Sequence, residues 1–198
     1  DQTDIDAANG DAFGLSLEDV NFGLAMMRPL AFPDIGATPK YYTLKATSGQ
    51  VGLVGMNDVI QLEAQKIVIE ANGATVPLPA LLNQPAINYK KSFESADGAN
   101  DGTFDIKTGR PDNPVTVEYD GYILRASVTG ALLKVADVLF INGNAEFTKG
   151  PVKDVVLEDG TAEQVTTMTL GIGNANGFLG MNGPYFHYVD DTPDDDII

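Results

Sequence analysis

The feature that most constrains the fold is a run of short segments that alternate apolar and polar residues and end at turn-forming residues. Segments 42–47, 51–54, 60–64 and 66–70 follow one another, with Gly, Asn, Asp or Ser closing a segment about every 8–10 residues. Segment 60–64 places Ile60, Leu62 and Ala64 in strict period two. That period indicates a strand with one buried face, so the series predicts an all-β fold.

The second half of the chain shows the same pattern of short alternating segments separated by turn residues. Seven further strands are predicted at 115–119, 122–127, 131–135, 138–141, 145–148, 152–157 and 165–172. The turn signals between them are Asp120-Gly121, Asn142-Gly143, Lys149-Gly150 and Asp159-Gly160. Such pairs supply the positive φ angles of tight hairpins. Hairpin turns favour a β-sandwich, whereas very short strands favour a β-solenoid-like stack, and both arrangements stay open. Little helix is expected, beyond one short turn at 79–83.

Two proline-rich stretches interrupt the strand pattern. Residues 75–114 hold five prolines, and residues 28–40 hold three. Proline at this density breaks a central sheet. We therefore expect a single β domain over 15–189, with an irregular insertion at 75–114, between an acidic linker at 1–14 and a second acidic linker at 190–198.

Negative charge is concentrated at the two ends of the sequence. The 198 residues carry a net charge of -16, with 12 basic and 28 acidic residues. Residues 1–11 and 190–198 hold nine of the acids and no base, so the remainder has a charge of about -7. This balance argues against nucleic acid or an anionic membrane as a partner, because both need a positive face. No window has the length of apolar sequence that a membrane span requires.

The residues needed for common enzyme chemistries are scarce. There is no Cys, and His187 is the single His, within an aromatic run that favours a packed role. No Gly-x-Ser-x-Gly elbow, phosphate loop or dinucleotide fingerprint occurs. We predict a protein that is not an enzyme; a secreted hydrolase with a carboxylate pair ranks last among the alternatives.

Calcium is the cofactor that the sequence predicts. Hard divalent cations take several oxygen ligands, and short loops rich in Asp and Asn supply them. The candidate ligands are Asp97, Asn100, Asp101 and Asp105 in one loop, Asp4 and Asp6 near the start, and Asp194 and Asp196 near the end. Neither end has the Gly and closing Glu of an EF-hand. A polar surface turn is the alternative interpretation of the loop, and solvated tails are the alternative for the ends.

Two aromatic clusters are candidate ligand-binding residues. Tyr41 and Tyr42 are adjacent, and Tyr185 and Tyr188 flank Phe186 and His187. Exposed aromatic side chains stack on sugars or anchor protein contacts, whereas buried ones belong to a core. Core packing is the favoured interpretation, and a glycan is the alternative partner.

Two segments of the chain recur. Residues 52–58 (Gly-Leu-Val-Gly-Met-Asn-Asp) return as 177–183 (Gly-Phe-Leu-Gly-Met-Asn-Gly), and 44–47 (Leu-Lys-Ala-Thr) return as 124–127 (Leu-Arg-Ala-Ser). Recurrence of this kind predicts a reused supersecondary unit that buries its apolar edge against the next. Chance similarity among Gly-rich strands is the alternative.

These segments, with 20–27 and 156–161, resemble a β-rich module repeated in very large secreted bacterial proteins of the adhesin type. The resemblance covers roughly residues 15–190, and the module has no established activity. It implies an extracellular or cell-surface building block whose acidic ends are linkers between modules, stiffened by calcium. The chain is then a mature product or a fragment of a longer one.

From the sequence we expect a non-enzymatic structural module, self-associating or arranged in tandem, and stabilised by calcium. Its partners are neighbouring copies or modules of the same protein. The alternative is a carbohydrate-binding or adhesion domain that uses the aromatic clusters and the calcium loop.

Overall fold

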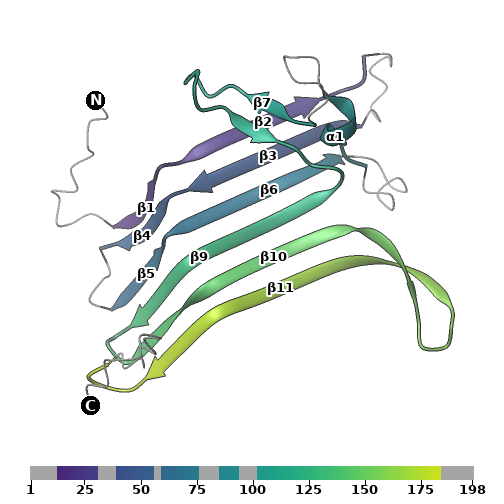
Figure 1. Ribbon diagram of the computed structural model, residues 1–198. Helices are drawn as coiled ribbons and strands as arrows, with labels where there is room; N and C mark the ends of the chain where they lie inside the picture. The colour runs from purple at the N-terminus through teal and green to yellow at the C-terminus, as the bar shows by residue number, and fades with distance from the viewer. Residues whose placement is uncertain (1–12, 31–38, 56–58, 76–84, 94–101, 184–198) are drawn as a thin grey trace, which may run out of the picture.

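The computed structural model describes residues 13–30, 39–55, 59–75, 85–93 and 102–183. These residues form one large curved antiparallel sheet of nine strands, a small two-stranded sheet and one short helix (Figure 1). The predicted all-β class is confirmed. The main sheet is open, and a second layer covers it at one end. The described residues therefore adopt neither of the two arrangements that the sequence left open, a complete sandwich or a solenoid stack.

The nine strands of the main sheet lie side by side in six rows, which we call tracks, and a track holds one strand or two strands end to end. They are β1 (Gly14–Glu18), β2 (Asn21–Met27), β3 (Lys40–Ser48), β4 (Gln50–Val54), β5 (Ile60–Ala64), β6 (Lys66–Thr75), β9 (Ile123–Val135), β10 (Leu139–Val156) and β11 (Ala162–Leu179). Three tracks consist of two strands end to end: β1 with β2, β3 with β4, and β5 with β6. Each track pairs antiparallel with the next along the chain, so the sheet is an up-and-down meander with β1–β2 and β11 at its edges (Figure 1).

The alternation of side chains changes phase halfway along β9. Even-numbered residues 124–128 and odd-numbered residues 131–135 both pair with odd-numbered residues of β10. Ala126 lies opposite Phe147, and Leu133 lies opposite Ile141. Because β10 alternates regularly between these positions, both halves of β9 present their apolar residues on the same face.

A row of extra residues at one level of the sheet causes this phase change. The row crosses five of the six tracks, at Asp19, Gly49, Gln65, Gly130 and Asn174. Three of these residues have positive φ: Asp19 at 50°, Gly130 at 61° and Asn174 at 50°. Such bulges bend a sheet and re-aim its side chains. Here they keep the apolar residues of both halves on one face.

Between β6 and β9, the described residues 85–93 and 102–122 lie over the face of the sheet opposite these apolar residues (Figure 1). They contain α1 (Tyr89–Ser92), β7 (Phe104–Ile106) and β8 (Val115–Val117), the last two paired antiparallel. Asn88 caps α1, because its side chain accepts a hydrogen bond from the Lys91 amide at 3.0 Å. We call residues 85–93 and 102–122 the insertion, and they form the second layer. The predicted insertion at 75–114 ended too early, because Val115–Val117 pairs with β7 and not with the main sheet.

A buried polar network joins the insertion to the sheet. The Tyr89 hydroxyl donates to Thr43 Oγ1 at 2.7 Å, and Thr43 donates to Asn72 Oδ1 at 2.8 Å. The amide of Asn72 in turn donates to the carbonyls of Ile87 and Gly121 at 2.7 and 2.8 Å. All three side chains are at most 1% exposed. Because every polar side-chain atom of Tyr89, Thr43 and Asn72 has a hydrogen-bond partner, the network fixes the insertion in one position.

The strand predictions were right in type and often too short. Predicted segments 122–127 and 131–135 lie almost entirely within the single strand β9, and 138–141, 145–148 and 152–157 lie almost entirely within β10. Asn142-Gly143 and Lys149-Gly150, predicted as turns, are therefore inside a strand. Asp159-Gly160 does form the β10–β11 turn, where the Asp159 carboxylate accepts hydrogen bonds from the amide and hydroxyl of Thr161. The predicted turn at 79–83 lies outside the described residues.

One of the two sequence repeats occupies equivalent places in the sheet. Leu44 in β3 and Leu124 in β9 lie opposite Ala71 of β6, one on each side. In the next row, Lys45 and Arg125 both lie opposite Glu70. The other repeat ends β4 and β11 at the same end of the sheet, although residues 56–58 are outside the described part (Figure 1).

Candidate functional site

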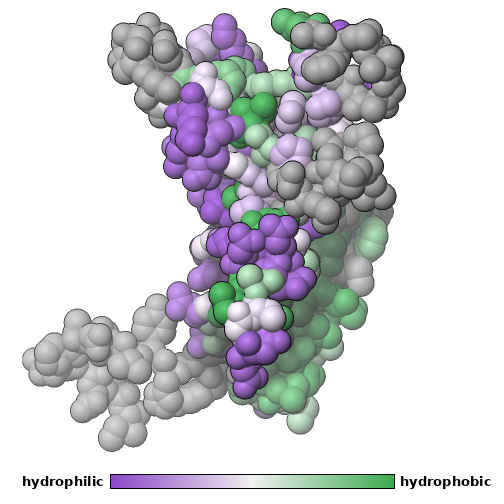
Figure 2. Space-filling model, turned by 90° about the vertical axis from the view of Figure 1, so that its right-hand side faces the viewer, coloured by the Kyte–Doolittle hydropathy of each residue, from purple (hydrophilic) through white to green (hydrophobic). Residues whose placement is uncertain are grey.

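The face of the main sheet opposite the insertion is almost entirely apolar, and we call it the apolar face. Thirteen of its large side chains are exposed: Leu15, Leu17, Phe22, Leu24, Met26, Leu62, Ile69, Leu124, Ile141, Met168, Leu170, Ile172 and Leu179. Figure 2 views the molecule along the sheet and shows hydrophobic residues gathered on one side and hydrophilic residues on the other. Isolated exposed apolar residues are common on proteins, whereas a continuous apolar sheet face marks an interaction surface.

The exposed fractions on this face run from 39% for Leu124 to 78% for Leu179. If each side chain offers about 200 Å² when fully exposed, the thirteen together leave about 1,400 Å² of apolar surface in solvent. The largest apolar patch on an ordinary monomer is about 300–600 Å². The apolar face is therefore more than twice as large as a soluble monomer usually tolerates.

Charged residues are almost absent from the apolar face. We leave aside the end of the β10–β11 hairpin beyond Lys149 and Met168, where β10 no longer pairs with β9. The acidic residues at the other strand positions of the main sheet are Glu18, Glu63, Glu70 and Glu146. The pairing register places all four on the opposite face, which we call the polar face. Among the same strand positions, two lysines lie on the apolar face, Lys40 and Lys149. The apolar face can thus be covered without burying a carboxylate.

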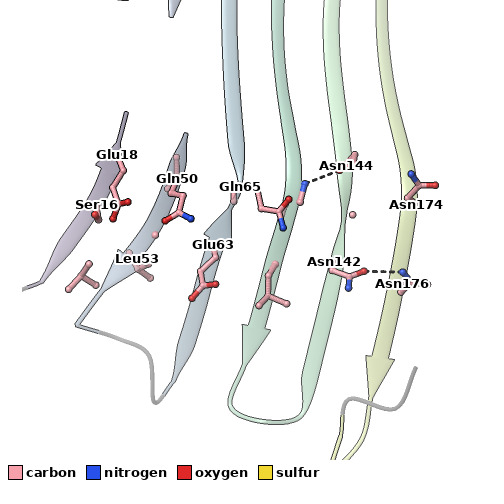
Figure 3. A pocket seen from close by; sticks show the side chains of 18 residues that line it. Ser16, Glu18, Gln50, Leu53, Glu63, Gln65, Asn142, Asn144, Asn174 and Asn176 are labelled. Carbon is pink, nitrogen blue, oxygen red and sulfur yellow. Dashed lines mark hydrogen bonds between the residues drawn. The ribbon is translucent and has the colours of Figure 1, made fainter. Parts of the chain in front are cut away.

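The polar face carries a groove of about 750 Å³ along the row of bulges (Figure 3). Its lining side chains end mostly in amides or carboxylates: Glu18, Gln50, Glu63, Gln65, Asn142, Asn144, Asn174 and Asn176. Two amides stabilise the sheet itself. Asn144 accepts a hydrogen bond from the Gly130 amide at 2.8 Å, and Asn176 donates to Asn142 at 3.1 Å (Figure 3). The groove therefore offers hydrogen-bonding groups beside a comparable amount of apolar surface.

At the other end of the polar face, the insertion encloses an aromatic cluster. Tyr89 stacks on Phe93 with ring centroids 5.0 Å apart, and its ring also contacts Phe104 and Tyr119. Glu70 is 4% exposed and forms an ion pair with Arg125. Burial, with the neighbouring Glu70, raises the pKa of the Tyr119 hydroxyl well above its ordinary value. Burial also raises the pKa of Tyr89, so both hydroxyls stay neutral at physiological pH.

Most of the residues predicted to hold calcium lie outside the described part of the chain. These are Asp4, Asp6, Asp97, Asn100, Asp101, Asp194 and Asp196. Asp105 is described: it is exposed on β7, and its carboxylate accepts a hydrogen bond from the Thr116 hydroxyl at 2.6 Å. Over the described residues, no three His, Cys, Asp or Glu side chains lie close enough together to hold a metal ion. Calcium stays a prediction.

The structure places two of the four predicted ligand-binding tyrosines. Tyr41 and Tyr42 are neighbours in β3, so they point to opposite faces of the sheet, and both are half-buried. Tyr42 lies on the apolar side, where burial and then the nearby Tyr122 raise its pKa. The two rings therefore do not form a joint stacking platform. Tyr185 and Tyr188 lie outside the described residues.

The sequence predictions did not identify the apolar face. Residues 14–18 and 21–27 were not among the predicted strands, although Phe22, Leu24 and Met26 alternate regularly. The alternating signal was present, but it reports that one side of a strand is apolar. It does not report whether anything covers that side, which depends on where the insertion folds.

Comparison of the chain with family models, with curated proteins and with solved structures gives no match in any of the three. In the part of the chain that the structure describes, no helix is long and apolar enough to cross a membrane. The functional argument therefore depends on the geometry of the two faces.

Proposed function

We propose that this protein is a non-enzymatic structural module that assembles with other β-rich units of a large secreted or cell-surface protein. The observation that carries the proposal is the apolar face, which the described part of the chain leaves uncovered. Hydrophobic burial is the main driving force of protein association, and a surface of this size favours it strongly. The polar face supports the proposal because its charged and amide side chains keep an assembled unit soluble.

Sedimentation of the purified full-length chain over a range of concentrations tests this function. We expect the mean mass to rise with concentration and the melting temperature to rise with it, because assembly stabilises the folded state by mass action. A monomer whose melting temperature is independent of concentration would contradict the proposal.

Calcium stabilisation remains part of the proposal for the loop at 97–105 and for the acidic ends. Thermal unfolding in the presence of calcium and after chelation tests it. We expect calcium to raise the melting temperature, since binding to the folded state alone stabilises it. An unchanged melting temperature after chelation would remove calcium from the proposed function and leave assembly intact.

The groove on the polar face favours carbohydrate binding as a second candidate function. Amide and carboxylate side chains are suited to hydrogen-bonding the hydroxyl groups of a sugar, and the groove is large enough for a small ligand. Calorimetric titration with a panel of oligosaccharides tests this. If the groove binds a sugar, Gln50→Ala should weaken binding, whereas Gln164→Ala, in the hairpin outside the groove, should not. If no oligosaccharide of the panel gives a binding signal, the sugars tested are excluded as ligands.

A further inference from the structure

We infer that the apolar face is covered by the apolar face of a second copy of this chain, so that two open sheets form one two-layer sandwich. The inference rests on the proposed assembly function and adds the partner and the geometry. Two sheets that pack face to face lie about 10 Å apart, with their inner side chains interdigitated. Each copy would then supply the layer that the other lacks.

The area of the apolar face fits this partner. Its exposed large side chains offer about 1,400 Å², and a stable interface of standard size buries about 800 Å² on each partner. The face can therefore be covered incompletely, or at an angle, and still bury enough surface for a specific dimer. A peptide or a small ligand would leave most of it in solvent.

The charge distribution fits a second copy as well. The described residues include 14 of the 28 acidic residues and all 12 basic residues, so their surface is close to neutral and does not repel a second copy strongly. Packing through the apolar faces leaves Glu18, Glu63, Glu70 and Glu146 on the two outer surfaces. This arrangement buries the most apolar surface and keeps the strand carboxylates furthest from the partner.

The position of the insertion leaves this approach open. Tyr89, Val115 and Val117, which are the buried apolar residues of the insertion, belong to the layer on the polar face. The insertion therefore does not stand between the two apolar faces. A two-fold axis would make the contact self-complementary, as in most soluble homodimers.

Adjacent residues of β11 provide a matched pair for the test. Leu170 lies on the apolar face and is 70% exposed, whereas Thr169 is exposed on the polar face of the same strand. Because the chain has no Cys, Leu170→Cys and Thr169→Cys each introduce a single thiol. The thiol-reaction rate of each full-length variant is measured below and above the concentration at which the chain associates.

Face-to-face packing predicts that association slows the reaction of Leu170→Cys at least about fivefold and leaves Thr169→Cys unchanged. It also predicts that Leu170→Glu weakens association at least about tenfold, because a carboxylate becomes buried, whereas Thr169→Glu does not. Circular dichroism and the melting temperature of dilute samples establish that each variant is folded.

Three outcomes would overturn the inference. If the chain associates while both thiols stay reactive, the copies pair through strand edges such as β11, and the assembly function stands without this geometry. If Leu170→Cys is protected only when phosphatidylcholine vesicles are added, the apolar face binds lipid. If the chain stays monomeric and both thiols stay reactive, the inference and the proposed function fail together.

Discussion

The two faces of the main sheet are made by the same strands and are completed in opposite ways. On the polar face, the insertion adds a layer, and buried hydrogen bonds among Thr43, Asn72 and Tyr89 hold it there. On the apolar face, no described residue adds a layer, and large side chains stay in solvent. Of the six buried apolar residues that the structure describes, Tyr89, Val115 and Val117 belong to the insertion. The stability of a single chain therefore depends strongly on the layer over its polar face, and its apolar face is available for a partner.

The largest expected effect comes from truncating the residue at the centre of the covered side. Tyr89 is 0% exposed, so Tyr89→Ala should lower the free energy of unfolding by about 3–5 kcal/mol. Phe22→Ala is the matched change on the apolar face, where Phe22 is 56% exposed. It should cost less than about 1.5 kcal/mol in dilute samples. Chemical denaturation measures both, and equal losses would contradict the contrast between the faces.

The second prediction concerns the row of bulges that keeps the apolar residues of both halves of the sheet on one face. Gly130 has a φ of 61°, and a Cβ there would lie 2.5 Å from the side chain of Gln65. Gly130→Val should therefore lower the free energy of unfolding by about 2 kcal/mol. Gly171→Val is the control, because a Cβ at Gly171 has no neighbouring atom within 4 Å. We expect that control to be neutral or slightly stabilising in the denaturation experiment, since valine suits a strand. Similar losses for both variants would show that the bulge is not needed.

The smallest effect is a loss of stability at alkaline pH that should come from the covered side. The pKa of Tyr119 and of Tyr89 is raised in the folded state, chiefly by burial, so the unfolded chain loses these protons first. The stabilisation is fully present below the ordinary tyrosine pKa of 10.0 and declines as the pH rises above it. For each tyrosine the slope cannot exceed about 1.4 kcal/mol per pH unit, because each side chain releases one proton.

Denaturation between pH 7 and pH 11.5 measures this slope. Tyr119→Phe should flatten the curve above pH 10, because it removes one of the protons that the folded state retains. A stability that rises above pH 10 would contradict the assignment.

Local sequence patterns predicted the strands well, because alternation and turn residues act over a few neighbours. They failed where a local signal was overruled by the sheet. Asn142-Gly143 has the composition of a hairpin turn, yet both neighbours of β10 pair across it, and Asn142 accepts a hydrogen bond from Asn176 instead. The helix at Tyr89–Ser92 was not predicted, because four residues carry too little periodicity to detect.

The candidate site was less predictable than the fold. The aromatic pair Tyr41 and Tyr42 was a reasonable candidate for stacking, but adjacent strand residues necessarily face opposite sides of a sheet. The amides that line the groove come from distant segments, as in Gln50, Gln65, Asn144 and Asn174. Nothing local links these positions, and the pairing of the strands brings them together.

The sequence by itself determined that this protein is built of β-strands, that it is strongly acidic, and that it lacks cysteine chemistry. Each of these properties resides in single residues or in near neighbours along the chain. The tertiary structure decided which side of the sheet is covered, because that depends on how residues 85–93 and 102–122 lie across β3 and β6. It also decided that the apolar residues of both halves share one face, because the bulges align only when the strands pair in register.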